Sequence, residues 1–187
     1  MDGPYLLILT GPPGAGKTTV GALVAARSAL AAHIESDWFW TTLVSGRTDP
    51  WERAADPQNR AVVRASVAAA ARLAAAGYAT VLDGIVGPWH LDLVREELGA
   101  LAVPVSYVVL RPAREHCLTR AVDRVDRDPR HRGALTRTGP IVDLWQQFSD
   151  LGDLERLVVD NSAERPDQTA ERIARVLATH SHRLPVA

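Results

Sequence analysis

Residues 11–18, with the sequence GPPGAGKT, have the residue types and spacing of a phosphate-binding loop. The pattern is G-x-x-x-x-G-K-[ST], and its fixed positions are Gly11, Gly16, Lys17 and Thr18. Glycines let consecutive backbone N–H groups surround a phosphate, and the N-terminus of a following helix adds partial positive charge. The lysine ammonium can reach the outer phosphates, and the threonine hydroxyl can ligate Mg²⁺. The loop therefore predicts a site for a nucleoside triphosphate and magnesium.

The segments on both sides of this loop have the composition that the motif requires. Residues 5–10 are an apolar run of strand length, and residues 18–28 are rich in alanine, valine and leucine without proline. An ordinary glycine–proline turn is the alternative interpretation, but it requires neither the fixed positions nor these flanks. Lys17 is also the only lysine among 21 lysines and arginines, and its compact charge suits a phosphate. We expect the nucleotide to contact Gly11, Pro12, Pro13, Gly14, Ala15, Gly16, Lys17, Thr18 and Thr19.

Two aspartates follow apolar segments and could act beside the phosphate site. Asp83 follows residues 78–82, where an acidic residue can hold Mg²⁺ through water; capping the next turn is its alternative role. Asp37 follows residues 31–36, and its carboxylate could take the proton from an attacking hydroxyl or orient that hydroxyl. It could also cap a following helix, a role compatible with catalysis. We expect Thr18 and Asp83 to hold the metal and Asp37 to act on the acceptor.

An arginine-dense stretch from residue 120 to residue 137 is interleaved with aspartates and allows two interpretations. As a fixed surface, it would be a solvated, self-paired charge run. Beside a nucleotide, it could instead form a lid, over about residues 126–138, whose arginines close over the phosphates. Arg120 and Arg127 lie seven residues apart, about two helical turns, so both can face the same nucleotide.

Tryptophans and glycines near the expected loops suggest a pocket for an organic acceptor. Glycine allows close approach of the backbone, and aromatic side chains commonly line ligand pockets. Core filling explains tryptophans equally well, so both interpretations stay open. The residues concerned are Trp38, Trp40, Trp51, Gly84, Gly87 and Trp89.

Apolar runs and helical segments alternate along the chain. This alternation predicts a three-layer α/β fold with a mostly parallel sheet of about five strands and helices on both faces. No repeat or long linker divides residues 1–187, so we expect a single domain with a loose tail over about 181–187. Strands are expected at 5–10, 31–36, 78–82, 103–110 and 157–160, and helices at 18–28, 61–76, 90–98, from Pro112 onward, at 141–148 and at 166–180.

The overall composition limits the classes of partner and location. A net charge of −1 supplies no global positive field, which weighs against nucleic acid and anionic membranes as partners. The longest apolar stretch, residues 65–82, contains interrupting polar residues, and the N-terminus lacks the pattern of a signal peptide. The single cysteine, Cys117, excludes an internal disulfide and fits a reducing cytoplasm, where a buried structural thiol explains it better than a nucleophile.

These features resemble the P-loop small-molecule kinases of the nucleoside monophosphate kinase-like superfamily, such as shikimate kinase, gluconate kinase and chloramphenicol phosphotransferase. The resemblance covers nearly the whole chain, and the P-loop is its specific part. It implies an acceptor-activating acidic residue after the second strand, the position of Asp37. It also implies an adenine-stacking arginine before the lid and a phosphate-binding arginine within it, the positions of Arg120 and Arg127.

The resemblance to shikimate kinase implies further substrate-binding arginines. One follows the lid, at the position of Arg137, and another lies on the helix before the third strand, where Arg60 and Arg64 share one helical face. The chain departs from that enzyme because residues 83–85 read DGI rather than a triple glycine. Residues 46–51 only loosely match gluconate kinase, so the identity of the substrate does not transfer.

The sequence therefore predicts an ATP-dependent kinase that transfers the γ-phosphoryl group to a hydroxyl of a small organic molecule with Mg²⁺. Lys17, Asp37 and Arg127 are the expected catalytic residues, and Gly84 and Trp89 are expected at the acceptor. A GTP-binding switch is disfavoured, because no Asn-Lys-x-Asp motif can exist without a second lysine. An ATPase coupled to a partner protein, a nucleic-acid 5′-hydroxyl kinase and a nucleotide-sugar kinase stay open as alternatives.

Overall fold

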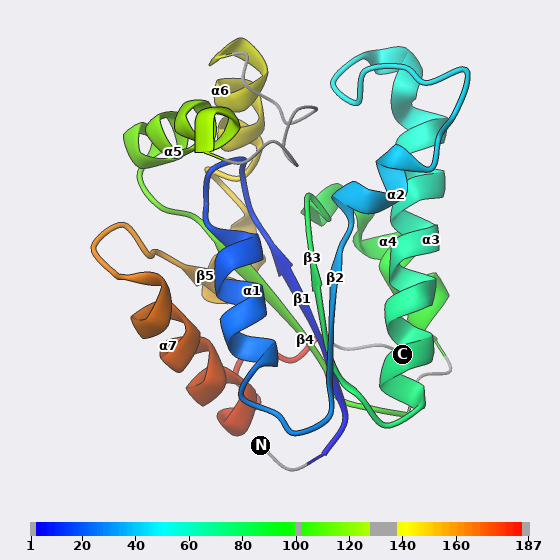
Figure 1. Cartoon of the computed structure of the whole chain (residues 1–187), viewed down its shortest axis with the longest axis vertical. Helices are drawn as coiled ribbons and strands as arrows, with labels where there is room; N and C mark the ends of the chain where they lie inside the picture. Colours follow the sequence, from blue (N-terminus) through cyan, green and yellow to red (C-terminus); the bar gives the residue numbers. More distant parts are fainter. Residues whose placement is uncertain (1–2, 100–101, 128–137, 185–187) are drawn as a thin grey trace.

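The computed structural model describes residues 3–99, 102–127 and 138–184, and its central layer is a parallel sheet (Figure 1). The sheet has five strands in the order β2-β3-β1-β4-β5, which confirms the predicted α/β P-loop architecture. The strands are β1 (Tyr5–Thr10), β2 (Ala31–Glu35), β3 (Ala79–Asp83), β4 (Val105–Leu110) and β5 (Val158–Val159).

Helices cover both faces of the sheet, α1 and α7 on one side and α3 and α4 on the other (Figure 1). The two longest of these, α3 and α7, have Pro57 and Pro166 in the first turn, where a missing N–H leaves no helical hydrogen bond unmade. The α-helices are α1 (Lys17–Ala25), α2 (Asp37–Thr41), α3 (Asp56–Ala75), α4 (Leu91–Leu98), α5 (Arg114–Arg127), α6 (Thr138–Gln147) and α7 (Pro166–Thr179), and the 3₁₀ turns are η1 (Arg53–Ala55), η2 (Pro88–His90) and η4 (Gly152–Leu157).

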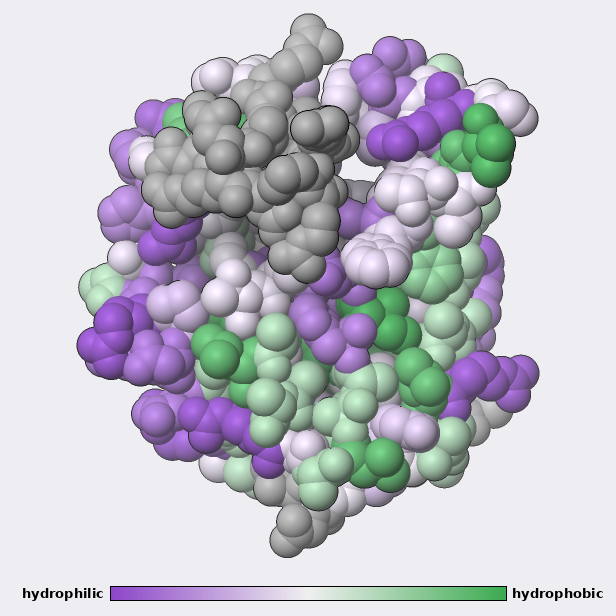
Figure 2. Space-filling model, viewed as in Figure 1, coloured by the Kyte–Doolittle hydropathy of each residue, from purple (hydrophilic) through white to green (hydrophobic). Residues whose placement is uncertain are grey.

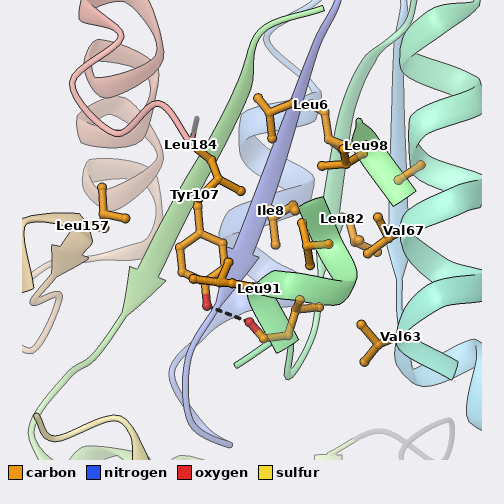
Figure 3. Packing of buried hydrophobic residues seen from close by; sticks show 14 of the residues in the cluster. Leu6, Ile8, Val63, Val67, Leu82, Leu91, Leu98, Tyr107, Leu157 and Leu184 are labelled. Carbon is orange, nitrogen blue, oxygen red and sulfur yellow. Dashed lines mark hydrogen bonds between the residues drawn. The ribbon is translucent and has the colours of Figure 1, made fainter. Parts of the chain in front are cut away.

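The strand β1 lies at the centre of the sheet and contributes side chains to two hydrophobic cores. Leu6 and Ile8 pack toward α3 and α4, in the core that also holds Tyr107 (Figure 3). Leu7 and Leu9 point to the other face and pack with α1 and α7. Successive side chains of a strand alternate between faces, so a fully apolar run suits a strand buried on both sides. The Tyr107 hydroxyl donates to the backbone oxygen of Val86 at 2.7 Å, which satisfies a buried polar group (Figure 3).

Several element boundaries differ from those predicted. β2 ends at Glu35, and Asp37 begins α2 instead of ending the strand. The helix α3 starts at Asp56, ahead of the predicted residue 61, because Pro57 is accepted in a first turn. β5 is shorter than predicted, since the preceding residues to Leu157 form a 3₁₀ turn. The helix α5 begins at Arg114, so Pro112 precedes the helix rather than opening it.

Part of the predicted loose tail is ordered against the sheet. The N–H of Leu184 donates to Val105 O at 2.9 Å, and the N–H of Tyr107 donates to His182 O at 3.0 Å. The Leu184 side chain is buried in the core beside Tyr107 (Figure 3). The prediction of a loose tail is therefore wrong for residues 181–184, because their apolar burial and backbone hydrogen bonds hold them.

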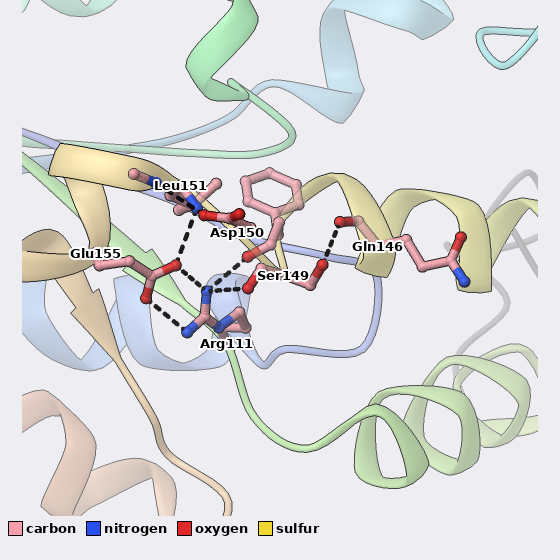
Figure 4. A network of polar contacts seen from close by, with 8 residues as sticks. Arg111, Gln146, Ser149, Asp150, Leu151 and Glu155 are labelled. Atoms are coloured by element: carbon pink, nitrogen blue, oxygen red, sulfur yellow. Dashed lines mark hydrogen bonds and ion pairs between the residues drawn. The ribbon is translucent and has the colours of Figure 1, made fainter.

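Arg111 attaches α6 to the end of β4 (Figure 4). Its guanidinium forms a two-point ion pair with Glu155 at 2.7 and 2.8 Å and donates to Phe148 O at 2.8 Å. The arginine also lowers the pKa of the Glu155 carboxyl, with a smaller contribution from the Leu151 N–H. The network fixes the C-terminal end of α6.

Among the described helices, none is long and apolar enough to cross a bilayer.

Candidate active site

A cleft of about 1260 Å³ lies at the carboxyl ends of the strands, the usual ligand position in open parallel sheets. Its walls come from the P-loop, α2, residues 47–51, the loop after β3, α5, α6 and the segment after β5. The surface is hollowed beside the segment that connects α2 to α3 (Figure 2). Small-molecule pockets measure about 300–1,000 Å³, so this cleft has room for two ligands.

The P-loop glycines are required by backbone geometry and by close packing. Gly14 has a φ of 78°, and a Cβ atom there would lie 2.1 Å from the Cys117 backbone oxygen of α5. Gly16 precedes α1 with a φ of 89°, a left-handed conformation that favours glycine. The loop can therefore curl beneath a phosphate only with glycine at these positions.

Lys17 is the first residue of α1, and its ammonium lies over the loop. The Nζ atom donates to the backbone oxygens of Gly11 and Pro12, both at 3.0 Å. Among the predicted nucleotide contacts, Gly11, Pro12 and Ala15 are buried. The residues that line the cleft are Pro13, Gly14, Gly16, Lys17, Thr18 and Thr19.

Asp83 is 3% exposed, and both of its carboxylate oxygens have partners. Oδ1 accepts the Thr18 hydroxyl at 3.1 Å, and Oδ2 lies 2.6 Å from Nε2 of His33. A buried carboxylate requires such partners because its desolvation is costly. The structure thus brings together the two residues predicted to hold the metal.

The donor set of Thr18 and Asp83 fits magnesium. Mg²⁺ prefers oxygen ligands and is usually bound by one or two carboxylates together with water and phosphate oxygens. Within residues 3–99, 102–127 and 138–184, no group of three or more His, Cys, Asp or Glu could cage a metal ion. A site shared with nucleotide phosphates, rather than a protein-only cage, agrees with this arrangement.

His33 was not among the residues predicted for this site. It lies in β2, paired with Val81 of β3, so Asp83 is two positions further along the neighbouring strand. Side chains two residues apart on adjacent strands share a face and can meet. Only the pairing of β2 with β3 reveals this contact.

Asp37 lies in the first turn of α2 and lines the cleft. Ser36 occupies the N-cap position, and no side-chain cap hydrogen bond is made there, so Asp37 is not the cap that the sequence allowed. The Ser36 N–H donates to Asp83 O at 2.8 Å, which ties the start of α2 to the end of β3. A Cβ atom at Gly84 would lie 1.7 Å from Ser36 Oγ, so glycine is needed for this close approach.

The predicted arginines fall into three groups. Arg120 lines the cleft from α5. Arg127 is the last residue of α5, where only the backbone is described, and Arg137 lies with most of the predicted lid outside the described residues. Arg60 and Arg64 lie on α3 outside the described lining, and Arg64 pairs with Glu96 and, at 2.8 Å, with Glu97 of α4.

Three of the four tryptophans considered for the acceptor pocket line the cleft. These are Trp40, Trp51 and Trp89, whereas Trp38 lies outside the lining and is 66% exposed. A Cβ atom at Gly87 would lie 2.3 Å from the Trp89 ring, so this glycine leaves space for the indole. The same ring packs against Phe148 with centroids 5.3 Å apart. The structure thus supports the pocket interpretation for three indoles.

Further polar residues of the cleft carried no recognisable sequence pattern. His90 is 7% exposed, and burial, together with the charge of Arg60, lowers the pKa of its imidazole. Asn59 donates to Pro50 O at 2.7 Å and holds the loop that carries Trp51. On the other side, Asn161 follows β5 and donates to Ala15 O of the P-loop at 3.0 Å. Arg47, Asp49, Asp143, Gln147 and Glu164 also line the cleft.

Comparison with known proteins agrees with this architecture. The AAA domain family matches residues 6–137, well over half of the chain. No curated protein matches the sequence.

Solved structures with the same fold include several kinases. Shikimate kinase from Acinetobacter baumannii, in complex with shikimate, is 22% identical with a TM-score of 0.60, covering 95% of this chain and 94% of its own. A sugar kinase from Janibacter sp. is 20% identical with a TM-score of 0.65, covering 94% of each chain. The APS kinase of Mycobacterium tuberculosis, in complex with AMPPNP and APS, is 17% identical with a TM-score of 0.69, covering 95% and 99%. The predicted resemblance to P-loop kinases is confirmed at the level of the fold, and the chain belongs to the AAA domain family.

Proposed function

We propose that the protein is an ATP-dependent kinase that transfers the γ-phosphoryl group to a hydroxyl of a small organic molecule. One observation carries the proposal: Lys17, the Thr18–Asp83 pair and Asp37 open onto a single cleft with room for two ligands. The APS kinase with the same fold binds AMPPNP together with APS, a comparable arrangement of two ligands. In this proposal, the nucleotide lies on the P-loop and the acceptor lies beside Asp37.

The P-loop residues hold the donor phosphates and offset the charge that develops on them. Lys17 reaches the outer phosphates, and Arg120 contacts the nucleotide from α5, with Arg127 as a further predicted contact. Thr18 and Asp83 would hold Mg²⁺, which would supply positive charge to offset the charge of the phosphates. Most of the catalytic effect is positioning and electrostatic stabilisation.

Asp37 prepares the acceptor. The hydroxyl oxygen forms a bond to the γ-phosphorus, the bond from that phosphorus to the bridging oxygen of ADP breaks, and Asp37 receives the hydroxyl proton. The hydrogen bond from Ser36 to the backbone oxygen of Asp83 attaches the start of α2, which carries Asp37, to the end of β3. Gly84 and Trp89 form part of the acceptor wall.

The substitution Asp37→Asn tests the proposed chemistry. It keeps the side-chain size and removes a negative charge and a proton acceptor, so we expect turnover to fall by about 10²–10⁴-fold. ATP affinity should stay within a few-fold, because the nucleotide is held by the P-loop. Thermal stability, ATP binding and turnover with an accepted substrate measure these effects. Normal turnover by the variant would refute the role of Asp37, and collapse of ATP binding would make it a nucleotide or metal ligand instead.

A single lysine allows a direct test of the nucleotide site. An amine-directed reagent should label Lys17 in addition to the N-terminus, and Mg-ATP should protect it. If saturating nucleotide did not reduce the labelling of Lys17, the P-loop assignment would be wrong.

ATP turnover that needs no acceptor would favour the alternative of an ATPase coupled to a partner protein. Phosphorylation of a nucleic-acid end or a nucleotide sugar would favour the remaining alternatives.

A further inference from the structure

We propose that the phosphate acceptor is a ring compound rich in hydroxyl or amino groups, a sugar or aminosugar, rather than a carboxylic acid. This inference rests on the proposed kinase function and concerns the acceptor half of the same cleft. That half is formed by α2, residues 47–51, the start of α3 and the loop after β3. Three independent features support the inference. They are the charged side chains of this half of the cleft, its exposed indoles and the position of the arginines on α3.

Among the described residues, the charged side chains of the acceptor half are two carboxylates and one guanidinium. Asp37 and Asp49 line it together with one cation, Arg47. The other cations of the described lining, Lys17 and Arg120, come from the P-loop and α5, on the nucleotide side. A carboxylate in the acceptor half would face two like charges, whereas hydroxyl or ammonium donors can hydrogen-bond to both aspartates.

The two arginines of α3 that were expected to bind the substrate lie outside the described lining. Arg64 forms ion pairs with Glu96 and Glu97, which attach α3 to α4. Arg60 precedes it by one helical turn and is likewise outside the described lining. The structure therefore gives no support to a substrate-binding arginine on α3, which the resemblance to shikimate kinase implies for Arg60 or Arg64.

Two indoles supply apolar faces at which a ring can stack. Trp51 and Trp89 line the cleft, and they are 40% and 42% exposed. Large aromatic faces open to solvent gain free energy when an apolar ring face covers them. A sugar ring has such a C–H face, and its edge carries hydroxyl groups.

A buried imidazole adds a neutral hydrogen-bonding group to this wall. His90 lines the cleft, and the Nδ1 atom of its imidazole is buried with no hydrogen-bond partner among the described residues. A neutral imidazole offers one donor and one acceptor, which suits a hydroxyl better than a carboxylate. Together, aromatic faces and few polar groups are the usual composition of a site for a neutral organic ligand.

Matched sugar series test this inference. ATP-dependent phosphorylation would be followed by mass spectrometry for the hexose, the 2-amino hexose and the uronic acid in the gluco, galacto and manno configurations. Shikimate, gluconate, a nucleoside and an aromatic alcohol complete the panel. We expect a neutral or amino sugar to be phosphorylated, with kcat/KM at least about tenfold above that of the matched uronic acid, which corresponds to about 1.4 kcal/mol.

Two results would overturn the inference while the kinase proposal stands. One is a preference for a uronic acid, shikimate or gluconate, and the other is phosphorylation of the nucleoside or the aromatic alcohol without any sugar. Failure of Mg-ATP to protect Lys17 would instead refute the nucleotide site on which both proposals depend. If Lys17 is protected and no member of the panel is phosphorylated, the sugar class is wrong.

Variants distinguish contact with the acceptor from a general structural effect. Trp51→Ala should raise the KM for the accepted sugar about tenfold and leave ATP affinity unchanged, because the indole lies on the acceptor side. Trp38→Ala is the matched control, since Trp38 lies outside the described lining, and it should change neither value. Asp49→Asn should reduce the discrimination against the uronic acid. An equal effect of both tryptophan variants, or undiminished discrimination in Asp49→Asn, would contradict the proposed recognition.

Discussion

At the scale of single residues, both carboxylate oxygens of Asp83, the residue proposed to hold Mg²⁺, have hydrogen-bonding partners within the protein. The Thr18 hydroxyl contacts one oxygen and His33 contacts the other. Because an ionised carboxylate only accepts hydrogen bonds, Nε2 of His33 must carry the proton when Asp83 is charged. Such neighbours hold a ligand in the orientation that metal binding requires, so their loss weakens metal affinity.

We therefore expect His33→Leu to weaken Mg²⁺ binding to the nucleotide complex by about 10–100-fold. Nucleotide affinity in the absence of metal should be unchanged, since His33 does not line the cleft within the described residues. His33→Gln, which keeps a donor, should recover part of the metal affinity. Titration of Mg²⁺ into the protein with an ATP analogue measures this effect. Equal losses of nucleotide affinity with and without metal would mean that His33 only supports packing.

At the scale of elements, α5 packs directly against the P-loop. The Cys117 backbone oxygen is so close to Gly14 that a Cβ atom would lie 2.1 Å from it. Burial raises the pKa of the Cys117 thiol to about 11, so the thiol is protonated and unreactive at neutral pH. The position of α5, which carries Arg120, is thus coupled to the conformation of the loop that receives the phosphates.

Gly14→Ala should destabilise the protein by more than the usual cost of alanine at positive φ, about 1–2 kcal/mol. Gly46→Ala provides the matched control, because Gly46 has a similar φ of 70° and no atom within 4 Å of the added Cβ. Denaturant unfolding measures both free energies, and their difference isolates the clash with α5. A displaced α5 should also make Cys117 react with a thiol reagent at pH 8. Equal destabilisation by the two substitutions would show that the loop accommodates the methyl group.

At the scale of the whole molecule, the packing of the layers buries His90 and half-buries His182. Burial lowers the pKa of His90 and of His182, with smaller contributions from Arg60 for the first and from Arg156 and Arg172 for the second. In the unfolded chain, these imidazoles regain a pKa of about 6.5. Below that value the unfolded state binds protons that the folded state does not, so the folded state loses stability as pH falls.

The free energy of unfolding should therefore decrease between about pH 7 and pH 5, before the carboxyl groups with ordinary pKa values near 4 titrate. Denaturant unfolding at several pH values measures this slope. His90→Gln should reduce it, whereas His116→Gln, at an exposed position, serves as the control. A slope that is the same in all three proteins would show that His90 does not contribute to this acid sensitivity.

The P-loop, the layered fold and most of the elements could be predicted from the sequence, because each depends on local pattern. The spacing of Gly11, Gly16 and Lys17 identifies the loop, and the apolar runs identify the strands on both sides of it. The approach of Thr18 to Asp83 was also predictable, since Thr18 comes after β1 and Asp83 ends β3 of the same parallel sheet. The differences concerned element boundaries, as with the earlier start of α3, and the ordered residues of the C-terminal tail.

The contacts between elements were decided by the tertiary structure. His33 meets Asp83 because β2 pairs with β3 in a particular register, and Arg64 is engaged because α3 packs on α4. Asn161 holds the P-loop backbone from a position 146 residues away. Local periodicity tells which face of an element is apolar, but it does not tell which side chain of another element will lie opposite. That relative placement is why Thr18 and Asp83 could be proposed as a pair from the sequence, whereas the contact of His33 with Asp83 could not.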